Sequence, residues 1–241
     1  MTQAPRPIRI DPDQLDLLAL ELDPAGFQSP LPVQHYALVF EDEGIGLAVG
    51  IWDTTTMQEA FGPYPGDEYV TVLVGHFVMV DAADAPLAAA RAGDSVTFRN
   101  GAPASWKQDG YLRKVYLTLQ DPKRETPRIA TAEGAFQVLD QTRLPQGSPG
   151  PDGVTREVTF RNAPGTMTVA LCSFPACKLP AAPAPSHRLV RVLAGAITLT
   201  EATSPPVHFA AGSHVFLPRG CACAWKVAAG SVAVIVDVIA P

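Results

Sequence analysis

The residues best suited to metal chemistry lie in the second half of the chain. They are Cys172, Cys177, Cys221 and Cys223, with His187 between the two pairs. Thiolate and imidazole are preferred ligands of zinc, so Cys223, Cys177 and His187 form a candidate metal set. The Cys-x4-Cys and Cys-x-Cys spacings are not a recognised zinc motif, and a buried reduced cysteine commonly behaves as a small apolar residue. We therefore expect no metal and no cofactor, and keep this set as an alternative.

The other histidines and the glycines carry no familiar catalytic motif. His35, His76, His208 and His214 are scattered, and none lies at ligand spacing from another. Each is expected at the surface or at a strand end. The sequence lacks a Gly-x-Ser-x-Gly elbow, a phosphate-binding loop and a dinucleotide fingerprint, because Gly44-Ile45-Gly46 is too short and has no helix after it.

The elements that must position a site are predicted to be short β-strands. The 241 residues include 24 prolines and 19 glycines, and this proline content is twice the usual ~5%. Such a density interrupts helices and favours strands joined by turns. Side chains from Glu68 to Gly75 alternate between two faces, as in a strand. The one helical stretch that we expect runs from Asp11 to Leu22, with Asp11 as its cap.

Charge and hydropathy limit the class of protein. The net charge is −6 and the Lys and Arg residues form no basic stripe, so we expect no nucleic-acid partner. The longest apolar runs, residues 70–80 and 231–240, are far shorter than the ~18–20 residues that span a bilayer, so we expect no membrane association. Residues 1–14 lack the apolar core of a secretory signal. These features predict a cytoplasmic protein with reduced cysteines.

A repeat within the chain is its most informative feature. Residues 68–80 and 188–200 each contain the motif Val-Leu-x-Gly. The glycines of the two motifs, Gly75 and Gly195, are 120 positions apart. Further along, residues 92–107 align with residues 211–226 so that a Trp-Lys pair and two glycines stay in phase. We infer a tandem duplication of one all-β unit.

The duplication divides the chain into three parts. Residues 1–122 form a first unit with a short N-terminal extension, residues 123–150 form a linker with an entry strand, and residues 151–241 form a second unit. Within the linker, residues 135–139 are expected to be the first strand of the second unit.

Both units resemble the cupin signature. In the first unit, Glu68 and Gly75 hold the Glu-x6-Gly spacing of the first cupin motif. The second motif, a Gly followed by Pro-x-Gly and then a His, is reproduced by Gly212, Pro218 and Gly220, with Cys223 in place of the His. The resemblance implies an all-β bicupin of the RmlC-like superfamily: two tandem jelly-roll (double-stranded β-helix) barrels, each with a pocket at its mouth.

The first unit more closely resembles the ureidoglycine-aminohydrolase and ethanolamine-utilisation branch of the cupins. The shared motifs are Gly50-Ile51-Trp52, Asp67-Glu68, Ala92-Gly93-Asp94, Trp106 and Lys114. The resemblance covers most of residues 35–120 and, more weakly, residues 154–240.

Many members of that family hold a divalent metal with two or three histidines and a glutamate. In this chain the first-motif histidine positions fall on Gly62 and Tyr64, or on Phe61 and Pro63, and the second-motif position is Ala104. A lone carboxylate, Glu68, cannot hold a metal tightly, so we expect a first unit without the usual metal. Ureidoglycine enzymes use a metal, and we therefore do not expect that activity.

If the first barrel closes as the resemblance implies, six polar and aromatic residues converge in it. The candidate catalytic residues are Glu68 and Lys114, and the candidate ligand-binding residues are Trp52, Tyr64, Trp106 and Tyr116. Apolar surroundings would raise the pKa of Glu68 and let it shuttle protons near neutrality, whereas a nearby Lys114 would keep it charged. The alternative is that Glu68 and Lys114 form a buried ion pair and that the tryptophans only fill the barrel.

The second unit departs further from the family pattern. Arg188 stands in place of the glutamate, Ala184 in place of Tyr64, and Cys172 in place of Trp52. An inward-facing Arg188 would bind a carboxylate or a phosphate, and Trp225, which aligns with Trp106, is the other candidate ligand-binding residue of this unit. We favour a degenerate second barrel that supports the fold and the dimer.

Three functions remain open. The first is a bicupin that binds a small polar metabolite in its first barrel and catalyses proton-transfer or hydrolytic chemistry through Glu68. The second is a non-catalytic sensor or accessory cupin, and the third is a metal-dependent enzyme that uses the cysteine and histidine set of the second barrel. Whether the protein is an enzyme is therefore open. We expect a homodimer, since cupin barrels commonly pair through exposed sheet edges and faces.

Overall fold

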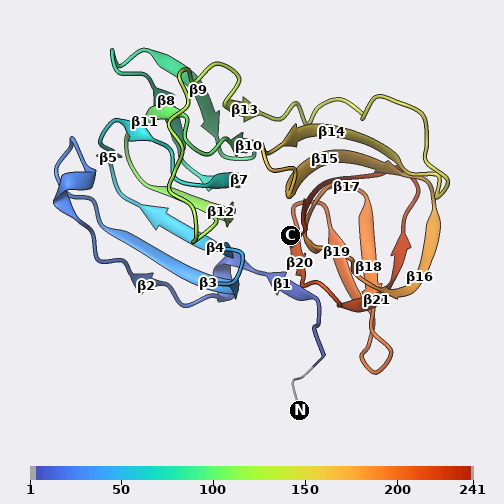
Figure 1. Cartoon of the computed structure of the whole chain (residues 1–241). Coiled ribbons are helices and arrows are strands. Elements are labelled where there is room, and N and C mark those ends of the chain that lie inside the picture. Colours follow the sequence, from blue (N-terminus) through green and yellow to red (C-terminus); the bar gives the residue numbers. More distant parts are fainter. Residues whose placement is uncertain (1–3, 240–241) are drawn as a thin grey trace. The chain divides into compact units, whose positions relative to one another are not determined.

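The protein is built of β-strands that fold into two units (Figure 1). The computed structural model describes residues 4–239. Within them, helix is limited to two 3-10 turns, η1 (Pro12–Gln14) and η2 (Pro24–Gly26), and neither is long and apolar enough to cross a membrane. Residues 12–139 form one unit, which we call the first barrel. Residues 140–239, together with residues 4–11, form the second barrel.

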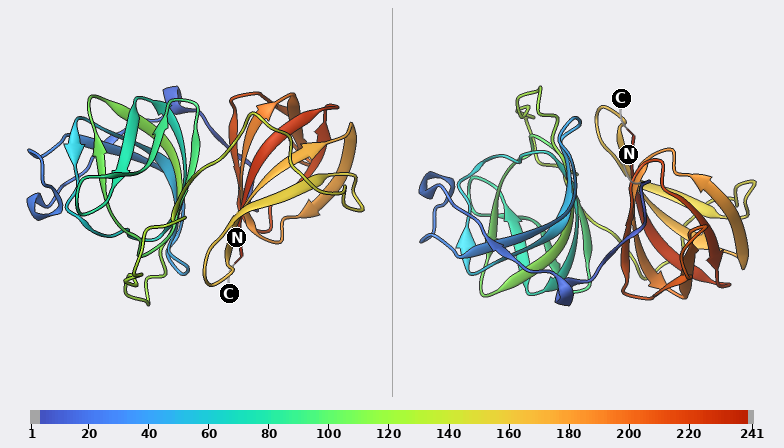
Figure 2. Two further views of the ribbon diagram at one scale, coloured as in Figure 1. Left: turned by 90° about the horizontal axis from the view of Figure 1, so that it is seen from above. Right: turned by 90° about the horizontal axis from the view of Figure 1, so that it is seen from below.

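The first barrel consists of two antiparallel sheets. Its strands are β2 (Leu18–Ala19), β3 (Gln34–Asp42), β4 (Leu47–Thr54), β5 (Met57–Gln58), β6 (Gly62–Pro63), β7 (Asp67–Val74), β8 (His76–Val80), β9 (Pro86–Arg91), β10 (Ser95–Phe98), β11 (Pro103–Gln108), β12 (Leu112–Leu119) and β13 (Phe136–Val138). The larger sheet has the order β13-β10-β7-β12-β4-β3-β2. The smaller has the order β5-β11-β8-β9, with β6 also paired to β11. Figure 2 shows these strands wrapping around a common axis.

The second barrel has the same plan. Its strands are β1 (Ile8–Ile10), β14 (Thr155–Arg161), β15 (Met167–Phe174), β16 (Cys177–Pro183), β17 (His187–Ala194), β18 (Ala196–Thr200), β19 (Val207–Ala210), β20 (His214–Leu217), β21 (Ala222–Val227) and β22 (Ser231–Val238). One sheet has the order β1-β20-β17-β22-β15-β14 and the other the order β16-β21-β18-β19. The predicted all-β fold with two tandem barrels is confirmed.

The two barrels repeat one another residue by residue. Lys114 on β12 pairs with Trp52 on β4, and Ala233 on β22 pairs with Cys172 on β15. The register therefore makes Lys114 equivalent to Ala233. Gly75 turns the chain between β7 and β8 with a φ of 81°. A Cβ at this position would collide with the carbonyl oxygen of Tyr111. Only glycine meets both demands at low cost, which explains why the repeat was recognisable at this position.

The helix predicted from Asp11 to Leu22 does not form. The chain makes the short turn η1 and then strand β2, in which Leu18 pairs with Tyr36 of β3. Leu18 and Leu20 are 60% and 39% exposed, so the apolar residues of this stretch have no buried face against which a helix would pack. Because such packing supplies most of the stability of helices in proteins, the local helical pattern is overridden.

The strand expected at residues 135–139 forms, but it belongs to the first barrel and not to the second. β13 pairs with β10, and Phe136 lies opposite Phe98 with their ring centroids 5.6 Å apart. The boundary between the two units therefore lies after Leu139. The equivalent edge position of the second barrel, next to β20, is taken by the N-terminal strand β1. Each barrel is completed by a strand from outside its own repeat.

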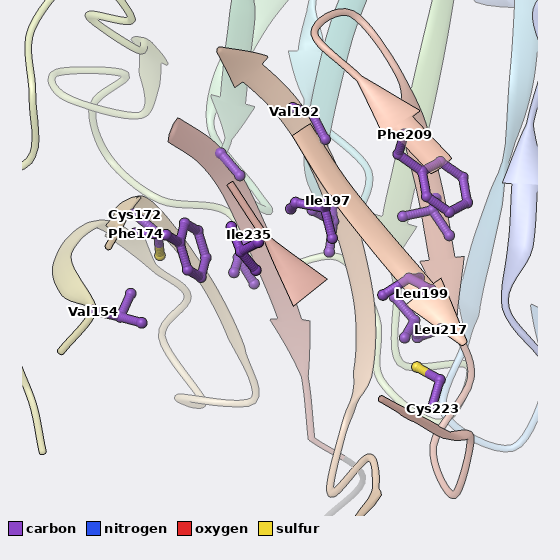
Figure 3. Packing of buried hydrophobic residues seen from close by; sticks show 14 of the residues in the cluster. Val154, Cys172, Phe174, Val192, Ile197, Leu199, Phe209, Leu217, Cys223 and Ile235 are labelled. Carbon is purple, nitrogen blue, oxygen red and sulfur yellow. The ribbon is translucent and has the colours of Figure 1, made fainter. Parts of the chain in front are cut away.

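The two cores differ in composition. In the first barrel, the rings of Phe77 and Trp106 stack with centroids 3.8 Å apart, and Phe98 lies 5.9 Å from each of them. The second core is mostly aliphatic and contains buried thiols, including Cys172 and Cys223 (Figure 3). In either core, burying one large aliphatic or aromatic side chain stabilises the fold by roughly 1.5–3 kcal/mol.

Candidate functional site

Two charged residues face the interior of the first barrel. Side chains alternate along a strand, so Glu68 shares a face of β7 with Val70 and Val72, which belong to the core. Lys114 shares a face of β12 with Leu112 in the same way. Glu68 is 6% exposed and Lys114 is 7% exposed. The strand pattern therefore places a carboxylate and an ammonium group among apolar residues.

The two charges form the centre of a cluster, which we call the Glu68–Lys114 cluster. Lys114 Nζ lies 3.0 Å from Glu68 Oε1, and the Tyr64 hydroxyl donates a hydrogen bond to Glu68 Oε2. Lys114 Nζ also lies 4.8 Å from the ring centroid of Trp52 and 4.7 Å from that of Trp106. Both carboxylate oxygens of Glu68 are therefore occupied, and the ammonium is held between two indole faces.

The indole rings are themselves fixed. The centroids of Trp52 and Trp106 are 6.1 Å apart, with their planes at 76°. Trp106 Nε1 donates to Gln108 Oε1 at 2.9 Å, which satisfies its only polar group and orients the ring. A desolvated cation over an aromatic face gains about 2 kcal/mol or more, and this offsets part of the cost of burying Lys114. The structure thus brings together five of the six site residues predicted in this barrel.

The sixth residue, Tyr116, lies two residues after Lys114 on the same face of β12 and packs against the barrel core. Burial and the nearby Glu68 charge raise the pKa of Tyr116 to about 12. Burial also raises the pKa of Tyr64 well above its ordinary value, and the charge of Glu68 raises it further. Both phenols therefore stay protonated near neutral pH, and Tyr64 donates its hydrogen bond to Glu68.

Sequence reasoning missed one residue of the site, Glu59. Its backbone N–H donates to the carbonyl oxygen of Trp106 at 2.9 Å, and its carbonyl oxygen accepts from Ser105 Oγ at 2.6 Å. Burial raises the pKa of Glu59 to about 7; Lys114 opposes this shift and Glu68 adds to it. Glu59 follows a two-residue strand in a segment without periodicity, so no sequence pattern marked it.

The residues present do not fit the metal that a cupin barrel commonly holds. At two of the family's histidine positions stand Gly62 and Ala104, which pair with one another across β6 and β11 and offer no side-chain ligand. Tyr64, at a third histidine position, donates a hydrogen bond to Glu68, which stands at the glutamate position. Among residues 4–239, no group of three or more His, Cys, Asp or Glu is placed to hold a metal ion.

The second barrel carries a different ion pair, in which Arg188 stands at the position equivalent to Glu68. Arg188 binds Asp237 through two hydrogen bonds, Nε to Oδ1 at 2.8 Å and Nη2 to Oδ2 at 3.0 Å. Ser186 Oγ donates to the same carboxylate at 2.6 Å. The predicted anion-binding group is therefore engaged within the chain. Trp225 is partly buried and packs on the core of this barrel.

The cysteine and histidine set of the second barrel is not assembled. His187 Nδ1 accepts a hydrogen bond from the backbone of Arg219 at 3.2 Å, and its ring stacks on Phe216 with centroids 6.1 Å apart. Cys223 instead packs in the apolar core near Leu217 (Figure 3), and Cys177 lies on β16 opposite Val227. The structure gives the metal alternative no ligand set within the described part of the chain.

Two hollows in the surface lie away from these residues. One, of about 560 Å³, is lined by Gly75, His76, Ala89, Ala90, Arg91, Ala92 and Asp94. Another, of about 110 Å³, is lined by Pro7, Arg9, Leu199, Glu201, Pro205, Val207 and Phe209. We give the Glu68–Lys114 cluster more weight than either hollow, because neither brings together buried groups that could act on a ligand.

Comparison with known proteins agrees with the fold. A family model described as the EutQ-like cupin domain matches residues 46–116 and 151–233. No curated protein shows significant sequence similarity to the chain. Among solved structures, a protein of unknown function from Pseudomonas syringae pv. tomato, of the DUF861 family, is 17% identical with a TM-score of 0.74, covering 97% of this chain and 99% of that one.

Two further structures are similar in fold. Ylba from E. coli, also of the DUF861 family, is 13% identical with a TM-score of 0.56, covering 98% of this chain and 93% of that one. HEPD from Streptomyces albus, solved with 2-hydroxyethylphosphonate and Fe(II) bound, is 10% identical with a TM-score of 0.58, covering 98% and 76%. At these identities the likeness concerns the fold alone.

Proposed function

The chain belongs to the family of EutQ-like cupin domains, and from this premise we propose that its first barrel binds a small polar metabolite and transfers a proton to or from it without a resident metal. The observation that carries the proposal is the Lys114–Glu68 ion pair, 3.0 Å long and buried beneath two indoles. Buried charge is expensive and is found most often where it serves a function.

The second barrel supports this interpretation, because it has the same strands without the buried pair. Ala233 takes the place of Lys114, and Cys172 takes the place of Trp52. Apolar residues at such positions are commonly as stabilising as an ion pair, or more so. The jelly roll itself therefore does not require the charges, which favours a role for them in binding.

The chemistry of the cluster selects the kind of ligand. An ammonium group has three N–H donors, and the Nζ of Lys114 gives one of them to Glu68. The others can reach a carbonyl or carboxylate oxygen of a ligand, while the faces of Trp52 and Trp106 accommodate its carbon atoms. A small molecule with at least one such oxygen fits this description.

The same arrangement favours proton transfer next to Lys114. A ligand that loses a proton leaves negative charge on its oxygen, and the fixed ammonium stabilises that charge in a water-poor setting. Glu68 holds Lys114 in place through the ion pair. We do not assign the proton transfer to Glu68 itself, because both of its carboxylate oxygens already accept hydrogen bonds.

The test uses four probes: the anions acetate and pyruvate, the neutral amide acetamide, and the cation ethanolamine. Binding to the full chain is measured by NMR titration, and proton transfer by exchange of the pyruvate methyl protons in deuterated water. We expect Lys114→Met to weaken binding at least tenfold and Lys178→Met, the same change at an exposed lysine, to leave it unchanged. Circular dichroism confirms that each variant is folded.

Four results would count against the proposal. Binding of none of the probes, or equal binding by Lys114→Met and the wild type, would remove the ligand site. Binding without exchange would remove the proton-transfer part and favour a ligand-sensing cupin. A stoichiometric metal in protein purified without chelator, with probe binding that depends on it, would contradict a site that works without metal.

A further inference from the structure

The first barrel contains two glutamates close to Lys114, and they are in very different states. Glu68 is almost fully buried, and each of its carboxylate oxygens accepts a hydrogen bond, from Lys114 or from Tyr64. Glu59 is half-buried, and within the described part of the chain its carboxylate takes part in no hydrogen bond or ion pair. One carboxylate is fully engaged and the other is available.

We propose that Glu59 is the catalytic acid–base residue of the first barrel and that Glu68 is a positioning residue that holds Lys114. The inference rests on the proposed function, since it assigns the proton transfer of that same site. It differs from the expectation based on the sequence, in which Glu68 carried the proton.

The backbone around Glu59 places its side chain beside the cluster. The N–H of Glu59 is bound to the carbonyl oxygen of Trp106, the same residue whose indole covers Lys114. Its carbonyl oxygen is bound to Ser105 Oγ. Two hydrogen bonds to neighbouring residues of β11 thus fix where the Glu59 side chain starts. General acid–base residues are most effective when their position is fixed in this way.

The charges that act on Glu59 are those of Lys114 and Glu68. Lys114 lowers the pKa of Glu59 and Glu68 raises it, while burial is the largest influence. The charge of Glu59 in turn raises the pKa of Tyr64. With a pKa of about 7, Glu59 is present in both protonation states near neutral pH, which is the best condition for accepting and returning a proton.

The proton moves between the Glu59 carboxylate and a carbon atom of the ligand. The Glu59 carboxylate takes a proton from a C–H bond next to a carbonyl group of the ligand, and that bond breaks. The electron pair moves into the ligand and ends on the carbonyl oxygen, to which Lys114 donates a hydrogen bond. Glu59 then returns the proton to a ligand carbon, and the ionisation state of the site is restored. No oxidant or reductant is needed.

The experiment compares Glu59→Gln with Glu43→Gln, the same change at an exposed residue of the first barrel. We expect Glu59→Gln to lower the rate of pyruvate methyl exchange at least about 100-fold, since general acid–base catalysis contributes about 10²–10⁴-fold. Binding of acetate should remain within about threefold of wild type. Glu43→Gln should change neither quantity.

A second measurement needs no ligand. In protein labelled with ¹³C at the glutamate side chains, one carboxyl resonance should titrate near pH 7. This resonance should be missing from Glu59→Gln and present in Glu43→Gln. If Glu59→Gln does not fold, Glu59→Asp replaces it in the exchange measurement, where a shorter side chain should still slow exchange at least about tenfold.

The outcomes separate this inference from the proposed function. If wild-type protein binds no probe, the proposed function fails. If the wild type binds and exchanges pyruvate, and Glu59→Gln does so within twofold of the same rate, the assignment of Glu59 is wrong while the function stands. If Glu68→Gln abolishes exchange without weakening binding, Glu68 is the acid–base residue after all.

Discussion

The two barrels have the same order of central strands, but the charged residue at one equivalent interior position has the opposite sign. In the first, Glu68 on β7 is paired with Lys114 on β12 at a site that is almost fully buried. In the second, Arg188 occupies the equivalent position on β17, and its partner Asp237 lies on β22. The sign of the charge on the equivalent strand is reversed, and the ion pair of the second barrel is about one-quarter to one-third exposed.

This difference separates what the fold needs from what a site needs. Gly75 and Gly195 occur in both barrels because each turn requires a positive φ. Lys114 has no charged counterpart, since Ala233 stands at its place in the second barrel. A barrel of this kind therefore forms without a charge at the position of Lys114, and the buried pair of the first barrel calls for a functional explanation.

The largest effect is expected when the buried pair is broken. Lys114→Met leaves the Glu68 carboxylate buried without its cation, and loss of one partner of a buried pair typically costs about 3–5 kcal/mol. The free energy of unfolding from urea titrations should fall by that amount. Adding Glu68→Leu to this variant should recover most of the loss, because no charge then remains unpaired.

The control for this prediction is Lys178→Met, at an exposed lysine of the second barrel, which should change the unfolding free energy by less than about 0.5 kcal/mol. A loss of similar size in both variants would mean that the interior of the first barrel is not a low-dielectric site. The contrast between the two barrels would then disappear.

Much of this contrast could be predicted from the sequence. The repeat aligned Glu68 with Arg188 and Trp106 with Trp225, and the resemblance to cupins implied that Glu68 and Trp106 converge inside the first barrel. Glu59 could not be found, because its burial depends on how the short strand β5 packs on β11. The exchange of edge strands was also missed, since a three-residue strand such as β1 or β13 carries too little pattern to show which barrel it joins.

The second prediction concerns the stability of the second barrel at low pH. Burial, together with the charge of Arg191, lowers the pKa of His214 from 6.5 to about 3. Below pH 6.5 the unfolded chain therefore binds a proton that the folded chain does not, and stability is lost as the pH falls. From pH 6.5 to pH 5 this amounts to about 2 kcal/mol, at ~1.4 kcal/mol per pH unit.

Urea unfolding at these two pH values tests this expectation. In His214→Gln the acid-dependent loss should shrink by about 2 kcal/mol, whatever the stability of the variant at pH 7. An unchanged pH profile would show that His214 is protonated in the folded protein or is not buried in solution.

The third prediction has the opposite sign and concerns the first barrel. The pKa of Glu59 is raised from 4.5 to about 7, so between these values the folded chain keeps a proton that the unfolded chain has released. The stabilising contribution is complete below pH 4.5 and is lost as the pH rises to 7. Because Glu59 is half-buried, solvent screening reduces the effect to about 1–2 kcal/mol.

Glu59→Gln should therefore be more stable than the wild type at pH 8, and the difference should vanish at pH 4.5. Glu43→Gln serves as the matched control and should show no such crossover. If both variants follow the wild type across this range, Glu59 titrates like an exposed glutamate, and the two barrels do not respond to pH in opposite directions.

The smallest effect is expected at the ion pair of the second barrel. Arg188 and Asp237 have side chains that are 30% and 26% exposed, so water screens their attraction and hydrates either charge when the other is removed. Pairs of this kind contribute about 0–1 kcal/mol. Arg188→Met should therefore lower the unfolding free energy by no more than about 1 kcal/mol, against the several expected for Lys114→Met, although Arg188 has the better bidentate geometry. A loss as large as that of Lys114→Met would show that geometry outweighs burial, and the second barrel would then have to be considered a charged site in its own right.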